Sequence, residues 1–531
     1  MLDISKKRYR LRIIIPAYPA FNIYSRAAKN TTALGPISVA SVVNKMEKWD
    51  VEVIDENNLR WYCPKDDAGA VDHEFLQQER AADIVGFYGG LTSAIPRIYQ
   101  LARFYKEKGA ITVAGGQHFV EENIAEGLSS GIDYIVIGEG EETIKELVHA
   151  IEGNLDTAKI KGIAYLSGGN IIRTPERGPI TDFDALPLPD FSLVRYAKIK
   201  TYPVGRIRGC GMDCEFCTVK GKARMASPER LLEAIRLLLE TRDARSFFIV
   251  DDLFGQQRNE TIRFCRMLSD YQKSVSKKLD LGVQIRLDKA KDAELLSAMR
   301  EAGISRVAIG FESPIEEELK AMNKELTPGD MISLALIFRR AGFTTHGMFI
   351  FAYPMREGVN FQMPLEERIK RFRQFIKKTK LDTVQILLPV PLSGTRLRKR
   401  LEKQNRVYPL EDLGWEYYDG TFPLFEPDKP MEAEEIQASA KKIMGKFYQF
   451  KYFFLVILSI FSFPAIIFFL HDIELGWKKW HRRWHNNMTR FGGWLTIKGW
   501  TKQFKKVKFS EKLLKARSHL NKPNGASRDH I

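Results

Sequence analysis

Residues 208–222 read RGCGMDCEFCTVKGK and place Cys210, Cys214 and Cys217 in one loop with the spacing Cys-x3-Cys-x2-Cys. Cysteine thiolates are the usual ligands of iron–sulfur clusters, and three of them leave the fourth iron of a cubane open to another ligand. A structural zinc site needs a fourth Cys or His nearby, and the next cysteine, Cys265, lies far along the chain in a helical stretch. Chance clustering is the remaining alternative. The spacing therefore predicts a [4Fe–4S] cluster.

Apolar runs after this loop predict the fold of the region around it. Helical patterns separate most of the runs, as in a chain of strand–helix units. Six such units predict an open (β/α)6 barrel, whose active site lies at the carboxyl ends of its strands. The predicted strands are 204–208, 246–250, 282–286, 306–310, 347–351 and 383–388.

The first part of the chain shows the same alternation and predicts a separate parallel α/β domain. Continuous apolar runs are typical of strands buried on both faces; here they are 12–16, 51–55, 83–88, 110–114 and 133–137, with helices near 38–47 and 96–108. Ligands of open parallel sheets bind beyond the carboxyl ends of the strands. The loops at that edge are 16–24, 89–94 (GGLTSA), 115–118 (GGQH) and 138–142 (GEGEE). They are either ordinary tight turns or, because glycine permits close backbone approach, a ligand site.

The cysteine motif and the segments after it resemble the radical S-adenosylmethionine (SAM) superfamily. In that family the cluster loop follows the first barrel strand, and the open iron binds the amino and carboxylate groups of SAM. The resemblance implies that the three cysteines ligate the cluster and that residues at the following strand ends contact SAM. Those residues are Phe216, Asp251 and Asp252 (VDDLF, 250–254), Gln284 and Arg286 (QIRLD, 284–288), and Glu312 (GFES, 310–313). Helix capping by the two aspartates and a solvated strand end at Glu312 are the plainer alternatives.

The N-terminal domain resembles the cobalamin-binding subgroup of that superfamily, most closely in residues 113–146 (VAGGQHFVEENIAEGLSSGIDYIVIGEGEETIKE). The Asp-x-His-x-x-Gly motif that supplies a cobalt ligand in other cobalamin proteins is absent from the sequence. His118 and His73 are interpreted as loop or surface histidines. The resemblance implies cobalamin without a protein histidine ligand, held by contacts around Thr92, Ser93, Gly115 and Gly116.

Most of the charge sits at the C-terminal end of the chain. The formal net charge is +16, but residues 471–531 carry 15 Lys/Arg against 4 Asp/Glu, together with five of the eight tryptophans. Before them, residues 452–470 (YFFLVILSIFSFPAIIFFL) are uncharged, at the lower length limit for a membrane span, and cations flank them on both sides. Tryptophan favours the headgroup level and clustered cations attract anionic lipids. We therefore expect a re-entrant or interfacial anchor; a buried helix with a solvated basic face is the alternative, and no nucleic-acid-binding fold accompanies the charge.

These observations predict an α/β protein with an N-terminal Rossmann-like cobalamin-binding domain, a partial (β/α)6 radical SAM barrel and a basic, Trp-rich, membrane-associated C-terminal region. The predicted boundaries are 1–160 for the cobalamin domain, 161–199 for a linker, 200–400 for the barrel, 401–450 for a helical extension and 451–531 for the membrane-associated segment and tail. The sparse cysteines indicate a reducing compartment. The first apolar run is too short for a signal-peptide core, so we expect the protein in the cytoplasm, on the inner face of the membrane.

Together the features resemble cobalamin-dependent radical SAM enzymes that act on lipids, such as hopanoid methylases. The resemblance implies that a 5′-deoxyadenosyl radical activates an unreactive carbon of a lipid or isoprenoid, which then receives a methyl group from methylcobalamin. It also implies an electron donor such as flavodoxin or ferredoxin, and no nucleic acid. The alternatives are radical cyclisation or rearrangement of a lipid or tetrapyrrole, a soluble peptide- or natural-product-modifying enzyme, and a non-catalytic iron–sulfur or membrane-docking protein.

Overall fold

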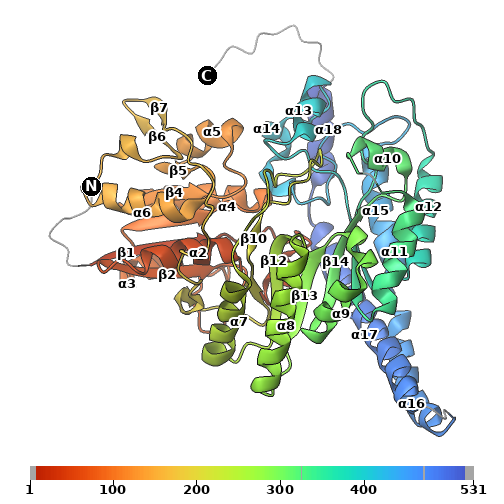
Figure 1. The fold of residues 1–531 in the computed structure, drawn as a ribbon. Helices are drawn as coiled ribbons and strands as arrows, with labels where there is room; N and C mark the ends of the chain where they lie inside the picture. Colours follow the sequence, from red (N-terminus) through yellow and green to blue (C-terminus); the bar gives the residue numbers. More distant parts are fainter. Residues whose placement is uncertain (1–7, 325, 470–472, 521–531) are drawn as a thin grey trace.

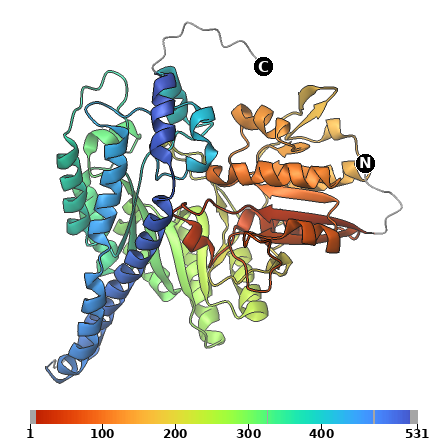
Figure 2. The same cartoon turned by 180° about the vertical axis from the view of Figure 1, so that it is seen from behind.

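Two largely parallel sheets lie side by side, and a helical tail lies beside the second sheet and reaches the junction between the two (Figures 1 and 2). The computed structural model describes residues 8–324, 326–469 and 473–520. Residues 1–7, 325, 470–472 and 521–531, which fall in the predicted first domain, barrel and tail, lie outside the described residues.

The N-terminal sheet has the strand order β7-β6-β5-β4-β3-β1-β2-β8. Its central strands are β1 (Tyr9–Ile15), β2 (Trp49–Asp55), β3 (Ile84–Tyr88), β4 (Ile111–Gly115) and β5 (Tyr134–Val136), all parallel. The order 2-1-3-4-5 is that of doubly wound nucleotide-binding folds. Every strand predicted for this domain is present, which confirms the predicted parallel α/β fold.

Helices cover both faces of this sheet. One apolar core lies under α2 (Leu34–Val43) and α6 (Gly140–Ile151), and the other lies under α4 (Ile95–Glu107) and α5 (Ile124–Ser129). The short helices α1 (Ser25–Ala28) and α3 (His73–Glu79) belong to the connections after β1 and β2. Residues 161–199, predicted as a linker, also add strands to the sheet: the antiparallel hairpin β6 (Ile163–Ser167) and β7 (Asn170–Arg173) at one edge, and β8 (Val194–Arg195) at the other.

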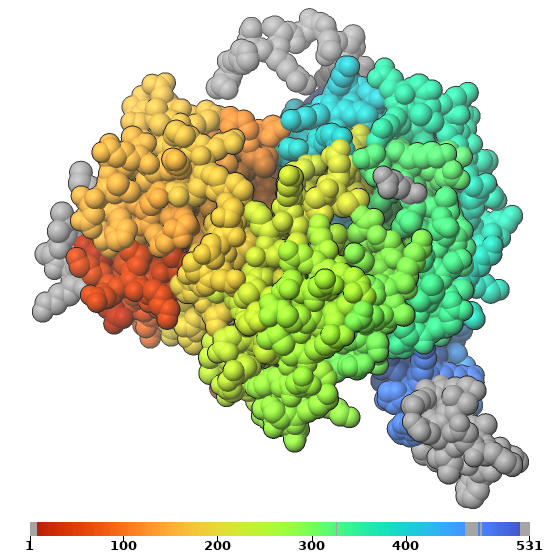
Figure 3. Space-filling model, viewed as in Figure 1, coloured from red at the N-terminus to blue at the C-terminus, as the bar shows by residue number. Residues whose placement is uncertain are grey.

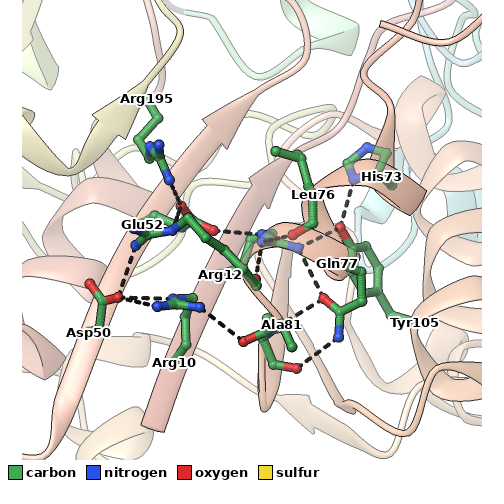
Figure 4. A network of polar contacts seen from close by, with 12 residues as sticks. Arg10, Arg12, Asp50, Glu52, His73, Leu76, Gln77, Ala81, Tyr105 and Arg195 are labelled. Atoms are coloured by element: carbon green, nitrogen blue, oxygen red, sulfur yellow. Dashed lines mark hydrogen bonds and ion pairs between the residues drawn. The ribbon is translucent and has the colours of Figure 1, made fainter. Parts of the chain in front are cut away.

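A buried ionic network lies inside this domain (Figure 4). Arg12 on β1 is fully buried and pairs with Glu52 on β2 at 2.8 Å. Its guanidinium also donates to the Tyr105 hydroxyl and to two backbone carbonyl oxygens before β3. Arg195 on β8 donates to the second oxygen of Glu52 at 2.8 Å, so the network joins the edge strand to the core.

The second sheet has six parallel strands in the order β16-β15-β14-β13-β12-β9. These are β9 (Tyr202–Val204), β12 (Ser246–Phe254), β13 (Asp280–Ile285), β14 (Ile304–Glu312), β15 (Thr344–Ile350) and β16 (Thr383–Leu387). The sequential order and the two unpaired edges confirm the predicted open (β/α)6 barrel. Its helices are α7 (Pro228–Arg242), α8 (Arg258–Ser274), α9 (Ala293–Glu301), α10 (Glu316–Ala321), α11 (Pro328–Arg340) and α12 (Leu365–Thr379).

The strand before the cysteines differs from the prediction. The apolar run 204–208 is not one barrel strand, because β9 ends at Val204 and the chain then turns into β10 (Ile207–Arg208). β10 pairs antiparallel with β11 (Arg224–Met225), and the two close a ribbon whose long loop carries the three cysteines. The side chain of Asp251 enforces the break by accepting the N–H groups of Arg206 and Ile207.

The C-terminal third is helical, as predicted. It comprises α13 (Arg396–Lys403), α14 (Leu410–Leu413), α15 (Ala433–Phe447), α16 (Lys451–Phe469), α17 (Ile473–Phe504) and α18 (Phe509–Leu520). α16 and α17 pair as a hairpin that projects from the body (Figures 1 and 3). The far half of α17 returns to the body, where the Trp500 indole donates to the carbonyl of Phe21 at 2.7 Å.

The buried network generates a stability prediction. Arg12→Met should destabilise the N-terminal domain by about 3–5 kcal/mol, because buried Glu52 would lose its one fully buried cation among the described residues and keep only the partly exposed Arg195 and Arg80. Arg10→Met, on the same strand, removes a partly exposed pair with Asp50 and should cost less than about 1 kcal/mol. Hydrogen exchange of the β1 and β2 amides measures both. Equal effects from the two variants would contradict the role given to Arg12.

Candidate active site

The cysteine loop lies at the carboxyl ends of the barrel strands and is half-buried. Burial raises the pKa of Cys214 and Cys217, and the neighbouring thiols add to this effect for Cys217. Among the described residues, no three His, Cys, Asp or Glu side chains converge to share one metal ion. A cubane does not need such convergence, because each thiolate binds a different iron. The three thiols in one loop therefore fit a [4Fe–4S] cluster, and their role as its ligands stays a prediction.

Two aspartates at the end of β12 fix the ribbon that carries this loop. Asp251 is buried, and its Oδ1 accepts the N–H groups of Arg206 at 2.6 Å and Ile207 at 2.9 Å. Burial raises the pKa of Asp251 to about 6. Asp252 accepts the N–H of Gly209, directly before Cys210, at 2.6 Å. Both aspartates thus hold loop backbone rather than cap a helix, and Asp252 also faces the cavity described below.

Other predicted SAM contacts reach the same loop from neighbouring strands. Arg286 donates to the Met212 sulfur at 2.7 Å. Glu312 has a positive φ of 59° and pairs at 3.1 Å with Lys324, and the charges of both act on the Cys214 thiol. Phe216 packs edge-on against Tyr353, with ring centroids 6.1 Å apart. Gln284 is exposed on β13, and its side chain has no hydrogen bond to a described residue.

A large cavity lies between the two sheets. Its volume is about 1100 Å³, at the upper end of the range of pockets for drug-sized ligands. One wall is the loop edge of the N-terminal sheet, including Gly115, Gly116 and the segment 136–141. The opposite wall is the base of the cluster ribbon, residues 203–209 and 218–220. A cofactor in this cavity would touch both domains.

Two glycines of the N-terminal wall have backbone conformations that other residues rarely adopt. Gly116 has a φ of +117°, and an added Cβ would lie 2.8 Å from the Gly89 backbone. Gly138 has a φ of +85° and faces open space. Thr92 and Ser93 do not line the cavity, and Ser93 is buried with its hydroxyl accepting from Asn22 at 2.9 Å. Their predicted cofactor contacts therefore have no support in this arrangement.

No described residue lining the cavity is a histidine, and cobalamin binding without a histidine ligand stays a prediction. His118 lies in a loop as predicted, but it is buried and packs against Trp415 at 4.8 Å. Burial lowers its pKa to about 3. His73 is also buried, bonded to Tyr105 at 2.7 Å and to Glu56 at 3.1 Å. The interpretation as loop or surface histidines is confirmed for His118, which lies in a loop although it is buried, and is wrong for His73, which begins α3 and is buried.

An ionic clamp joins the two walls, and sequence reasoning missed it. Glu139, in the GEGEE loop, pairs with Arg208 at 3.1 Å and Arg224 at 2.8 Å, on the two strands of the cluster ribbon. Arg208 also pairs with Glu141. Burial favours the neutral form of Glu139, but hydrogen bonds from Arg224 and the Ile180 N–H, with the charge of Arg208, hold its pKa below the usual value. The loop that faces the cavity thereby also positions the cysteines.

A second ion pair ties the loop to the C-terminal extension. Glu215, between the second and third cysteines, is buried and pairs with Arg400 of α13 at 2.7 Å. The Tyr353 hydroxyl donates to the same carboxylate at 2.7 Å. The cluster loop is thus held on one side by the N-terminal domain and on the other by α13.

Two family models match the chain in the regions that form these walls. A B12-binding domain matches residues 26–148, and the radical SAM superfamily matches residues 204–360. The chain is a cobalamin-binding radical SAM protein. Its cofactors are accordingly cobalamin, SAM and a [4Fe–4S] cluster.

Curated relatives match the chain over different lengths. An uncharacterized methyltransferase of Pyrococcus horikoshii is 27% identical over 82% of this chain and 92% of its own length. The anaerobic magnesium-protoporphyrin IX monomethyl ester cyclase of Cereibacter sphaeroides is 29% identical over 53% of this chain and 48% of its own length. The hopanoid C-2 methylase of Rhodopseudomonas palustris is 24% identical over 52% of this chain and 50% of its own length. The chain thus spans only about half of the latter two.

Solved structures show the same fold. The radical SAM methyltransferase TsrM of Kitasatospora setae, with cobalamin and a [4Fe–4S] cluster bound, superposes with a TM-score of 0.59 at 17% identity, over 75% of this chain and 78% of its own. The cobalamin-dependent SAM radical enzyme OxsB, with aqua-cobalamin and SAM bound, gives 0.59 at 15% identity, over 99% of this chain and 82% of its own. At these identities the likeness concerns the fold alone.

The clamp generates a prediction about this cobalamin-binding radical SAM protein. Glu139→Gln should lower cobalamin retention about tenfold, because hydrogen bonds to a charged group contribute about 1.5–3 kcal/mol. Iron retention should fall with it, since the same residue positions the cluster ribbon. Glu142→Gln removes a neighbouring carboxylate that pairs only along its own helix, with Lys145, and should retain both cofactors. Metal analysis and absorption spectra after anaerobic reconstitution measure both variants; equal retention would refute the clamp.

Proposed function

We propose that this chain is a cobalamin-dependent radical SAM methyltransferase that methylates an unactivated carbon of a lipid or isoprenoid. The shared cavity is the observation that supports methyl transfer. One space of about 1100 Å³ is lined by both the B12-binding loops and the cluster ribbon. Cofactors held on the two walls face the same volume. The relative that matches this chain over 92% of its own length is named an uncharacterized methyltransferase.

In this proposal the protein positions groups whose chemistry belongs to the cofactors. When bound, the cluster with SAM supplies a carbon-centred radical, and cobalamin supplies the methyl group. Cys210, Cys214 and Cys217 would hold the cluster. Asp251 and Asp252 fix the backbone before the first cysteine, while Arg286 and Glu312 place charges beside the loop where an amino-acid moiety would bind. A flavodoxin- or ferredoxin-like donor would reduce the cluster.

Loss of one ligand tests the radical chemistry. Cys214→Ala should abolish formation of 5′-deoxyadenosine from SAM under reducing, anaerobic conditions, because a two-cysteine loop no longer holds the cluster. Cys63→Ala and Cys265→Ala are the matched controls, since both thiols are buried in apolar cores away from the loop. Liquid chromatography of the nucleoside product distinguishes them. A Cys214→Ala protein that still forms 5′-deoxyadenosine would contradict the assignment of Cys214 as a cluster ligand.

Cyclisation of a tetrapyrrole or lipid is the second candidate, and relatives named as magnesium-protoporphyrin cyclases favour it. The product mass separates the two reactions. Methylation adds one CH₂ unit, whereas cyclisation or desaturation removes two hydrogens.

The preference for a lipid rests on the projecting hairpin. Over the described residues, one helical stretch, Ala433–Phe461, is long and apolar enough to cross a membrane. On α16 the side chains of Phe454, Leu458 and Phe461 are 55%, 60% and 76% exposed, an arrangement that is costly in water. A relative that is 24% identical over 52% of this chain is named a hopanoid C-2 methylase. We infer that the hairpin attaches the enzyme to the inner face of the membrane, with the rest of the chain in the cytoplasm.

Substitution of the exposed apolar residues tests this attachment. Phe454→Ser/Leu458→Ser/Phe461→Ser should lower binding to phosphatidylcholine vesicles at least about tenfold, because each buried apolar side chain contributes about 1.5–3 kcal/mol. The control Trp61→Ser/Leu166→Ser/Val359→Ser removes equally exposed apolar residues elsewhere and should bind as the wild type does. Vesicle flotation measures both. Substitution is preferable to truncation, because α17 and α18 also bury residues in the body.

A further inference from the structure

A second cavity lies where the hairpin leaves the barrel. Its volume is about 930 Å³, and its walls come from α11 and α12 of the barrel, the end of α15, the start of α16 and the middle of α17. α11 and α12 lead into β15 and β16, so this cavity is at the amino ends of the barrel strands. The catalytic cavity lies at the opposite, carboxyl ends. The two spaces therefore serve different ligands.

The lining of this second cavity is strongly basic. Of its nineteen lining residues ten are Lys or Arg and one, Glu366, is acidic. The one acidic group is already bonded to Lys442 at 3.3 Å. Eight of the ten cations form no ion pair with a described residue. Five of these eight also make no side-chain hydrogen bond or cation–π contact with one: Arg373, Lys377, Lys380, Lys446 and Arg483. Such a concentration of one charge in a concave site attracts anions.

Other cations are held in place by the backbone around them. Arg482 of α17 donates to the carbonyl of Arg339 at 3.0 Å, and Arg490 donates to the carbonyl of Leu381 at 3.0 Å. Burial and the charge of Arg339 lower the pKa of Arg482. These bonds fix α17 against the barrel and keep the cationic walls close together. The site is thus built from segments about a hundred residues apart in the sequence.

The basic cavity continues directly into the apolar face of the hairpin. Lys451 and Tyr452 line the cavity and begin α16. Phe454 and Leu458, within the next two turns, are exposed. A bilayer presents the same sequence of environments, with phosphate groups beside hydrocarbon. Asn486 and Asn487 add amide donors to the cavity wall.

We propose that this cavity binds the phosphate headgroup of an anionic membrane lipid while the hairpin enters the acyl layer. The proposal rests on the membrane attachment inferred above and adds to it a defined headgroup site. The proposal also defines how the enzyme is oriented on the membrane. The amino ends of the barrel strands face the bilayer, and the catalytic cavity faces away from it. The hairpin is then an anchor that holds the enzyme near its lipid substrate and does not line the reaction site, so that the lipid must leave the bilayer to reach the catalytic cavity.

Vesicle flotation with the full chain tests this site. Vesicles of phosphatidylcholine alone are compared with vesicles that contain phosphatidylglycerol, an anionic lipid. The variant Arg373→Gln/Lys377→Gln/Lys446→Gln should lose at least about tenfold in binding to the anionic vesicles, because each cation near such a surface contributes a factor of about five. The matched control Lys45→Gln/Lys48→Gln/Lys159→Gln removes the same charge from exposed lysines of the N-terminal domain that form no ion pair with a described residue, and it should bind as the wild type does. The charge-preserving variant Arg373→Lys/Lys377→Arg/Lys446→Arg should retain binding, which excludes a folding defect.

Each outcome decides a separate point. Equal losses in the cavity variant and its control would overturn the site in favour of diffuse charge attraction. Equal binding of the wild type to neutral and anionic vesicles would overturn the headgroup site while leaving the hairpin attachment intact. No binding to any vesicle would overturn both proposals. If inorganic pyrophosphate binds the wild-type chain tightly, loses that binding in the cavity variant and does not displace the chain from anionic vesicles, the cavity serves a free phosphate compound and the lipid assignment fails.

Discussion

The pairing of Glu139 and Glu141 with Arg208 and Arg224 is the interaction on which the arrangement of the active site depends. The carboxylates belong to a glycine-rich turn of the B12-binding domain, and the guanidiniums belong to the two strands that carry the cluster loop. Each wall of the catalytic cavity is thereby defined relative to the other. Without these ion pairs the two sheets would not need to share one cavity, because each sheet could bind a ligand at its own carboxyl edge.

The clamp works together with bonds inside the barrel. Asp251 ends the first barrel strand early by taking two backbone N–H groups, so the chain leaves the sheet and forms the ribbon. Glu215 then anchors the far side of the loop to Arg400. The cysteines are therefore positioned from three directions, although none of these contacts involves a cysteine side chain. Preorganisation of this kind keeps a cofactor fixed while it reacts.

Periodicity and the cysteine spacing predicted most of the fold, because strand–helix alternation and local ligand motifs are properties of short segments. The strands around Ile13, Val53 and Val283 were all found where apolar runs placed them. The clamp could not be predicted, since Arg208 and Glu139 are 69 residues apart and each alone resembles a solvated charge. The buried position of Arg12 could not be predicted from the sequence either, because it depends on partners from three other segments. Thr92 and Ser93 do not line the cavity, because a polar loop at the correct sheet edge need not face it, and their contact with a cofactor stays a prediction.

In the proposed attachment, the C-terminal tail determines which end of the barrel faces the membrane. Its hairpin and basic cavity lie at the amino ends of the barrel strands, whereas both cofactor walls lie at the carboxyl ends, so attachment and chemistry are separated. The most direct test of lipid methylation is mass spectrometry of lipids from a deletion strain and its parent, both grown with methyl-deuterated methionine. The account predicts a lipid that the deletion strain lacks, one CH₂ unit heavier than its precursor and carrying a deuterated methyl group. Identical lipids in the two strains, or a missing product that differs by two hydrogens and carries no label, would contradict it.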